Sequence, residues 1–297
     1  MTTQIPQGYK QTSIGIIPDD WEVKKMKEIA KVQGGYAFDS RKFTSHGKFQ
    51  VVKMSNVYNG NLDLERSGSY LPILTAQEEK FKLNHDDILI TLTGTIGKRD
   101  YGYSYRIIDE ENLVLNQRVA RLITKKECAN PIYLSYEVKT KRLLNQFFFS
   151  TRGGTGNQAN VGTGDVELLK VALPPHPEQQ KIAEILTTWD TAIETCQKTI
   201  EQLKQRNRGL AQQLLSGKKR LEGFEDQEWN FVKFKEFYAP NKKPSGNAKF
   251  ELLSVTKNGI VSQEKYFNKS IASEDTSKYL IVERGDFVVS GLNFWMG

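Results

Sequence analysis

Three short segments carry residue types that could bind a nucleotide or transfer a methyl group. Gly154-Thr-Gly156-Asn-Gln-Ala159 fits the G-x-G-x-x-A pattern of a dinucleotide-binding loop, but it follows a helical pattern and no long helix opens directly after it. Gly94-Thr-Ile-Gly97-Lys98 is too short for a phosphate-binding loop and has no Ser or Thr after the lysine. Adenine methyl transfer needs an Asn or Asp before Pro-Pro, whereas Leu173 precedes Pro174-Pro175 here. We therefore predict no catalytic residues, and a nucleotide-dependent enzyme resting on residues 154–159 is the weakest alternative.

The sequence gives little support for a metal site or a membrane-spanning segment. The cysteines and histidines are Cys128, Cys196, His46, His85 and His176. They are scattered, and no spacing among them could clamp a metal ion, so we expect no metal and no cofactor. The first nine residues are polar, and no apolar run approaches the roughly 18 residues that a membrane span requires. We expect a cytoplasmic protein that has reduced thiols and does not contact a membrane.

The polar residues of four segments are of the kinds that bind DNA. The chain has 42 Lys and Arg against 35 Asp and Glu, a formal net charge of +7, which suits a nucleic acid partner although it also serves solubility. Asn, Gln and Arg side chains can read base edges, and Lys or small hydroxyls usually hold phosphates. The candidate DNA-binding residues are Lys53, Ser55, Asn56, Thr93, Thr95, Lys98, Arg99, Asn116, Gln117, Arg118, Arg152, Thr155, Asn157, Gln158 and Asn160. Each alone is equally well explained by turn chemistry, but the set favours a DNA surface.

The elements that must position these residues belong to a mixed α+β domain. Recurring apolar and β-branched runs predict strands at 49–52, 88–92, 103–108 and 119–123. One helix interrupts them, with Asn130 as its cap, Pro131 in its first turn, and an apolar face that runs to Phe147. Residues 152–164, rich in Gly, Thr and Asn, are predicted to form a loop.

A heptad pattern then predicts a long coiled-coil helix. Apolar residues alternate spacings of four and three along a seam formed by Ile182, Leu186, Trp189, Ile193, Cys196, Ile200, Leu203, Asn207, Leu210 and Leu214. Pro177 suits a helix start, and Gly217 followed by basic residues suits a stop. The helix would have about 40 residues and a length of roughly 60 Å. A strip this narrow and long would overhang its own domain, so we favour a coiled coil over an amphipathic helix packed on that domain.

An internal repeat follows the helix. The first match has an offset of 208 and relates Asp20-Trp21 and Lys25–Ile29 to Glu228-Trp229 and Lys233–Phe237. Two further matches share an offset of 199: Ser55 with Asn59-Gly60 matches Ser254 with Asn258-Gly259, and Asp87–Thr91 matches Asp286–Ser290. The repeat predicts a first domain at 1–172, a spacer helix at 173–220 and a partial second copy of the domain at 221–297.

These features together resemble the specificity subunit of type I restriction-modification systems, with its second recognition domain cut short. The segments that carry the resemblance are Gly15-Ile-Ile-Pro18 with Trp21, Leu173-Pro-Pro-His-Pro-Glu-Gln-Gln-Lys-Ile-Ala-Glu-Ile-Leu186, and the restart at Trp229. The resemblance implies two target-recognition domains, each reading half of a split site in double-stranded DNA. It also implies that conserved helices set the distance between the domains and bind methyltransferase subunits, in a complex with a restriction subunit.

We therefore predict a non-catalytic DNA-recognition subunit whose first domain reads DNA and whose long helix sets spacing. The helix is expected to pair with a methyltransferase subunit or with a second copy, giving a homodimer. In an antiparallel homodimer Ile193 would face Leu203 and Trp189 would face Asn207, with Ile182 opposite Leu214. A structural coiled-coil protein without DNA binding is the main alternative.

Overall fold

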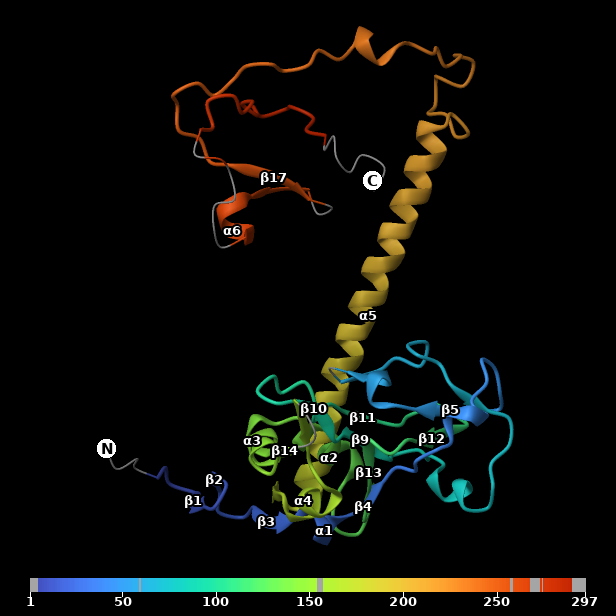
Figure 1. Ribbon diagram of the computed structural model, residues 1–297, viewed down its shortest axis with the longest axis vertical. Coiled ribbons are helices and arrows are strands. Elements are labelled where there is room, and N and C mark those ends of the chain that lie inside the picture. Colours follow the sequence, from blue (N-terminus) through green and yellow to red (C-terminus); the bar gives the residue numbers. More distant parts are fainter. Residues whose placement is uncertain are drawn as a thin grey trace. The chain divides into compact units, whose positions relative to one another are not determined.

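The structure is a computed structural model that describes residues 5–58, 60–153, 157–256, 259–267, 273 and 275–289, without the side chains of residues 152 and 153. The chain divides into two compact units, Met1–Gln205 and Arg206–Gly297 (Figure 1). Within the described residues no helix has the length and apolar character needed to cross a membrane.

A four-stranded antiparallel sheet forms the centre of the first unit. Its strands are β11 (Ser104–Arg106), β9 (Ile88–Thr91), β13 (Val119–Thr124) and β4 (Ala30–Gly34), in that order. Ile88 and Ile90 belong to one apolar cluster and Leu89 to another. Successive side chains of a strand point to opposite faces, so both faces of the central sheet are covered and β9 is buried along its whole length.

Smaller sheets surround this centre. They comprise β5 (Phe49–Val52) between β12 (Leu113–Leu115) and β8 (Tyr70–Leu71), β15 (Gln158–Asn160) between β10 (Thr93–Thr95) and β14 (Arg152–Gly153), β3 (Glu22–Lys25) with β16 (Lys170–Leu173), β1 (Tyr9–Thr12) with β2 (Gly15–Pro18), and β6 (Val57–Tyr58) with β7 (Asn61–Leu62). β5 and β12 run parallel, and the other pairs are antiparallel. The four strands predicted from the sequence are confirmed, each within about two residues at either end.

The helix predicted after Asn130 is wrong in its continuity, because two helices stand in its place. α2 (Pro131–Glu137) begins as expected, since the Asn130 side chain accepts hydrogen bonds from the backbone of Ile132 and Tyr133. α3 (Lys141–Phe149) has its own cap, because the Thr140 hydroxyl accepts from the backbone N–H of Leu143. A capping Thr competes with helical backbone bonding, and this ends one helix and starts the next.

The predicted loop at 152–164 is also wrong in part. It contains the short strands β14 and β15 and the start of α4 (Thr163–Leu168). Val161 donates its backbone N–H to Leu92 O at 2.9 Å, and β15 continues the hydrogen bonding of β10. Polar strands of two or three residues lack an apolar alternation long enough to be read from the sequence. The short helix α1 (Met26–Ile29) and the 3₁₀ turns η1 (Ser40–Lys42), η2 (Met54–Asn56) and η3 (Glu78–Phe81) complete the unit.

The long helix is confirmed as α5 (His176–Leu215), which has 40 residues. Its first turns are attached to the first unit through Gln179, whose buried amide accepts from Asn130 N at 2.8 Å and donates to Pro174 O at 2.9 Å. Trp21 also donates its indole N–H to Glu178 at 3.1 Å. The helix ends at Leu215 and is followed by Gly217, which has a φ of +72° and donates its backbone N–H to Leu214 O at 3.1 Å. Left-handed backbone at this position favours glycine, as the sequence predicted.

The second unit contains η4 (Phe234–Glu236), the hairpin of β17 (Leu253–Thr256) and β18 (Gly259–Ser262), and α6 (Gln263–Phe267). Two of its turns reproduce turns of the first unit at the repeat offsets. Asp286 accepts from Glu283 N at 3.0 Å, as Asp87 accepts from Asn84 N at 2.9 Å. Lys233 N likewise donates to Glu236, as Lys25 N donates to Glu28. The repeat therefore has local structural counterparts, while the domain limits 173–220 and 221–297 stay predictions.

Candidate nucleic-acid interface

The four polar segments singled out in the sequence meet at one edge of the first unit. Three backbone hydrogen bonds connect them in a row: Asn116 N to Val52 O at 3.1 Å, Leu92 N to Arg118 O at 3.0 Å, and Val161 N to Leu92 O at 2.9 Å. Each bond lies where a strand enters or leaves its sheet, so the adjoining loops emerge side by side. We call residues 53–56, 93–100, 116–118 and 157–160 the loop edge. β10, which carries part of the loop edge, and β14, which belongs to the same sheet, lie beside α3 in Figure 1.

The segment 93–100 forms a turn held at its base by a carboxylate. Asp100 accepts from the backbone N–H of Thr95 at 2.6 Å and from its hydroxyl at 2.9 Å. These hydrogen bonds, led by the one from the Thr95 backbone, hold the pKa of Asp100 below its ordinary value. Lys98 is exposed on this turn, whereas the Arg99 guanidinium lies 5.0 Å from the centre of the Phe148 ring. Lys98 is therefore the freer of the two cations.

The segments 116–118 and 157–160 carry the amides that are best placed to contact a ligand. Gln117, Arg118 and Asn157 are exposed, and Gln158 is half-buried beside Thr95, its partner across β10 and β15. Asn116 and Asn160 are half-buried as well. The Asn160 side-chain oxygen accepts from the Thr93 hydroxyl at 2.9 Å, and Thr93 is buried. Thr93 is thus a structural partner of Asn160, and its buried hydroxyl is not placed to contact DNA.

In the segment 53–56, the structure removes a further residue from the candidate DNA-binding residues. Asn56 is only 1% exposed. Its side chain accepts from Lys53 N at 2.8 Å and donates to Asp63 O at 2.8 Å and to Arg66 O at 2.6 Å. Both amide N–H groups are used inside the protein and the side chain is buried, so Asn56 holds the turn together and does not reach a base. The Lys53 ammonium contacts Ser69 Oγ at 2.5 Å and lies 5.2 Å from the centre of the Phe43 ring, while Ser55 is half-buried.

Two of the predicted site residues cannot be placed. Thr155 lies outside the described residues, and of Arg152 only the backbone is described, where it pairs with Asn160. The sequence reasoning also missed Gly35 and Tyr36, which join the loop edge through hydrogen bonds to Val119 O and Leu115 O, both at 2.9 Å. A Cβ on Gly35 would lie 2.0 Å from the carbonyl oxygen of Asn116. The pair Gly34-Gly35 at the end of a strand was the signal for this close approach.

A buried ion pair lies at the start of β9, the end of that strand opposite to segment 93–100. Arg121 donates to Asp87 at 2.7 Å and to Gln33 at 2.9 Å, and its side chain is almost fully buried. Burial raises the pKa of Asp87, against the lowering effects of its bond from Asn84 N and of the Arg121 charge. Because Arg121 and Gln33 come from β13 and β4, these bonds connect neighbouring strands of the central sheet, and Arg121 is not available to DNA.

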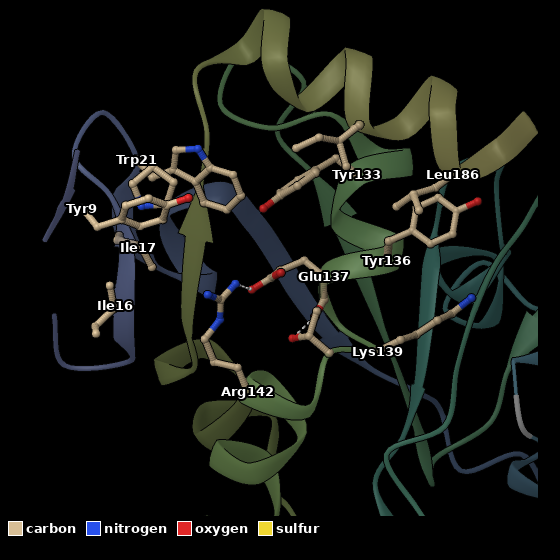
Figure 2. Close-up of a pocket in the computed structure, with 13 residues that line it drawn as sticks. Tyr9, Ile16, Ile17, Trp21, Tyr133, Tyr136, Glu137, Lys139, Arg142 and Leu186 are labelled. Atoms are coloured by element: carbon tan, nitrogen blue, oxygen red, sulfur yellow. Dashed lines mark hydrogen bonds and ion pairs between the residues drawn. The ribbon is translucent and has the colours of Figure 1, made fainter. Parts of the chain in front are cut away.

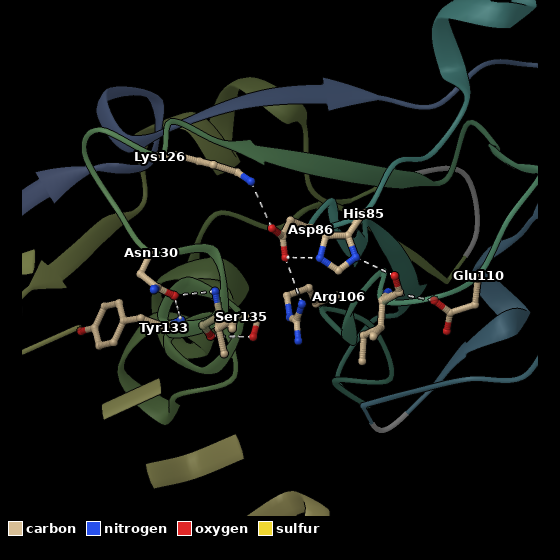
Figure 3. Close-up of polar contacts among 10 residues, drawn as sticks. His85, Asp86, Arg106, Glu110, Lys126, Asn130, Tyr133 and Ser135 are labelled. Carbon is tan, nitrogen blue, oxygen red and sulfur yellow. Dashed lines mark hydrogen bonds and ion pairs between the residues drawn. The ribbon is translucent and has the colours of Figure 1, made fainter. Parts of the chain in front are cut away.

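The first unit has a second polar cluster, around Asp86, outside the loop edge. Figure 3 shows Asp86 between Arg106, Lys126 and His85, at 3.0, 3.4 and 3.5 Å respectively. Asp86 has a φ of +72°, so its turn is strained for a non-glycine residue. The ion pairs hold this turn against β11 and the segment that precedes α2.

A cavity of about 640 Å³ lies between the β1–β2 hairpin, α2 and the first turns of α5 (Figure 2). Trp21, Tyr133 and Tyr136 contribute to its walls, together with the ion pair of Arg142 and Glu137 at 2.7 Å. Burial raises the pKa of the Glu137 carboxyl, against the lowering effect of Arg142. Ile182 and Leu186 of α5 also line this cavity.

The predicted seam on α5 divides into attached and exposed positions. Ile182 packs against the core of the first unit and Leu186 is half-buried, so neither is fully available to a partner helix. From Trp189, which is 66% exposed, the seam is open. Its exposed members are Trp189, Ile193, Cys196, Ile200, Leu203, Asn207 and Leu210. Leu214 is half-buried beside the end of the helix.

Comparison with known proteins identifies the class of this chain. Residues 18–205 match the model of the type I restriction modification DNA specificity domain, and the chain belongs to this family. It is 31% identical over 221 residues to the type I restriction enzyme MjaVIII specificity subunit of Methanocaldococcus jannaschii, with 72% of this chain and 50% of that protein covered. It is 29% identical over 186 residues to the type I restriction enzyme EcoAI specificity subunit of Escherichia coli, with 61% of this chain and 30% of that protein covered.

A solved structure agrees with this assignment at the level of the fold. The S subunit of a type I restriction-modification system from M. genitalium matches with a TM-score of 0.51 and 16% identity, covering 82% of this chain and 62% of that chain. The resemblance drawn from the sequence is confirmed, as is the mixed α/β domain followed by a 40-residue helix. The chain spans about half the length of the curated relatives it matches first.

Proposed function

We propose that this chain is a non-catalytic subunit that recognises a double-stranded DNA sequence for the methyltransferase and restriction subunits of a type I restriction-modification complex. The observation that carries the proposal is the loop edge, which gathers polar segments far apart in sequence within a chain of this family. The first unit reads one part of the target, and α5 fixes the distance to the next reading element.

The composition of the loop edge suits DNA on physical grounds. Gln117, Gln158 and Asn157 present amides that can bond base edges in pairs. Lys98 and Arg118 are exposed cations on the same edge and suit phosphates, which carry no sequence information but set position. A surface with both kinds of group can hold a duplex and discriminate among sequences. Asn116, Asn160 and Thr95 on the same edge are half-buried.

We further propose that the exposed seam of α5 binds another helix, either of a methyltransferase subunit or of a second copy. Burying a large apolar side chain is worth roughly 1.5 to 3 kcal/mol, so the open face of α5 favours association. In an antiparallel pair of copies centred on residue 198, Trp189 faces Asn207, Ile193 faces Leu203 and Cys196 faces Ile200. This pairing uses the exposed members of the seam, and the indole N–H of Trp189 could bond the Asn207 oxygen.

The DNA-binding proposal is tested by selecting bound duplexes from a random pool with the purified chain. We expect one short sequence motif to be enriched. Affinity for the selected duplex should fall steeply as salt rises, because phosphate contacts release counterions. A pool without enrichment, or an affinity that does not change with salt, would favour a coiled-coil interaction protein that does not bind DNA.

A further inference from the structure

Ile96 stands at the tip of the turn in segment 93–100, between groups that suit DNA. Its side chain is 48% exposed. Thr95 precedes it and Lys98 follows two residues later, while Asn157 and Gln158 lie on the adjacent segment. Neither phosphate binding nor hydrogen bonding to bases accounts for a branched apolar side chain at this point. An exposed apolar side chain placed among groups that suit DNA can contact an apolar group at a base edge.

The turn holds Ile96 in a defined position. Lys98 N donates to Thr95 O at 3.1 Å, and Gly97 has a φ of +81°, which together are typical of a type II turn with Ile96 at its second residue. The backbone N–H of Ile96 donates to Asn157 O at 3.1 Å, so the tip is fastened to the neighbouring segment as well. The Asp100 carboxylate closes the base of the turn through Thr95.

Close packing beneath the turn fixes its base. A Cβ on Gly94 would lie 2.4 Å from the Tyr101 ring and 2.5 Å from Asp100 Oδ1, so only glycine fits there. In contrast, a Cβ on Gly97 would meet nothing within 4 Å. The turn is therefore packed on its inner side and open on its outer side, where Ile96 and Lys98 stand.

The major groove of DNA offers one apolar group at the base edges, the 5-methyl group of thymine. We propose that Ile96 recognises a thymine by direct contact with this methyl group, while the amides of Asn157 and Gln158 read the neighbouring base edges. This inference rests on the proposed DNA-binding function of the loop edge and adds the identity of one base to it.

The experiment uses the full chain and the duplex selected from the random pool. Each thymine of the selected motif is replaced in turn by deoxyuridine, which keeps every hydrogen-bonding group and every phosphate and removes only the methyl group. For the wild-type chain we expect affinity to fall about fourfold at one position, the effect of exposing one methyl group. For Ile96→Ala we expect weaker binding to the thymine duplex and no difference between thymine and deoxyuridine at that position. Ile96→Val should keep part of the difference.

Ile73→Ala is the matched control. Ile73 is 79% exposed and follows β8. In β8, Leu71 pairs with Phe49, which is the first residue of β5. The loop edge begins after Val52, at the other end of β5. This variant should bind both duplexes as the wild type does. Equal wild-type affinity for thymine and deoxyuridine at every position would overturn the inference, as would a difference that persists in Ile96→Ala or a selected motif without thymine. Those outcomes leave the DNA-binding function intact, whereas a pool without any enriched motif would instead remove that function and the inference with it.

Discussion

At the residue scale, the polar side chains of the loop edge divide by whether the fold already uses them. Gln117 is exposed and on a segment that joins two strands, whereas Lys98 is an exposed cation on a turn. Base edges carry sequence and phosphates do not. We therefore expect Gln117→Ala to relax preference at one base pair by about 1 to 3 kcal/mol, and Lys98→Ala to weaken binding to all sequences and to reduce the salt slope by about 1. Affinities for single-base variants of the selected duplex distinguish the two effects, and a loss of the same kind in both variants would refute the division.

Asn56 should behave in the opposite way. Its three hydrogen bonds are made inside the protein, and truncation would leave Lys53 N, Asp63 O and Arg66 O without a partner. We expect Asn56→Ala to lower the free energy of unfolding by about 2 to 4 kcal/mol, with no change in base preference of the protein that remains folded. Urea unfolding measures the first quantity and binding to single-base variants the second. A stable variant with altered base preference would return Asn56 to the DNA-binding set.

The buried Glu137 predicts a pH dependence of stability. Its pKa is raised above 4.5 by burial, so the folded state holds the proton more tightly than the unfolded chain. The contribution of Glu137 to stability is therefore largest below the unfolded pKa and is lost as pH rises through the folded pKa. Glutamine stays neutral, so the stability of Glu137→Gln relative to the wild type should increase over that interval. Unfolding measured from about pH 4 to about pH 7 tests this, and a difference that stays constant would contradict it.

The sequence singled out segments that the structure brings together at the loop edge, but it did not show which of their side chains are already bonded inside the fold. Asn56 and Gln117 are both polar residues near a strand end, and nothing local separates them. What separates them is a contact between segments, because Asp63 and Arg66 fold back to use the Asn56 amide. Ile96 was passed over for a related reason, since an apolar residue in a polar segment gives no signal until its exposure is known.

At the scale of elements, long periodic patterns were predicted well and short ones poorly. The 40-residue α5 and its stop at Gly217 follow from the heptads and from glycine, and the buried β9 follows from an apolar run. β15 forms by pairing with β10 on one side and β14 on the other, contacts that no local pattern records. The break between α2 and α3 depends on Thr140, whose capping hydroxyl outweighs the helical periodicity around it.

The seam of α5 gives a prediction about association. Leu203 is 42% exposed and lies near the middle of the open part of the seam. If two copies pair there, a carboxylate at this position would be buried opposite Ile193, and pairing should be lost. Sedimentation of the wild-type chain should show a dimer, and Leu203→Asp should be a monomer. Gln205→Asp, on the opposite face of the helix, is the control that should remain dimeric. A wild-type monomer, or a dimer that survives Leu203→Asp, would exclude pairing of two copies through this face.

At the scale of the whole molecule, the first unit carries the loop edge and α5 is a helix of 40 residues, about 60 Å long, with an open apolar face. Two turns of the second unit repeat those of the first, at Asp286 and at Glu236. Under the proposed function, a chain with repeated reading elements on either side of a long helix would read a target in separated parts. We propose that the methyl-transfer chemistry belongs to a partner subunit and that this chain selects where on the DNA that partner acts.

The most direct test of the proposed selection of a DNA target is a genome-wide map of methylated adenines. The map is made in cells that co-express the chain with the methyltransferase subunit of its own system. We predict that methylation depends on the chain and falls within one recurring sequence motif, and that Gln117→Ala relaxes one position of that motif and leaves the others unchanged. Methylated adenines without a common motif, or the same motif whether or not the chain is present, would contradict the claim that this chain selects the DNA target.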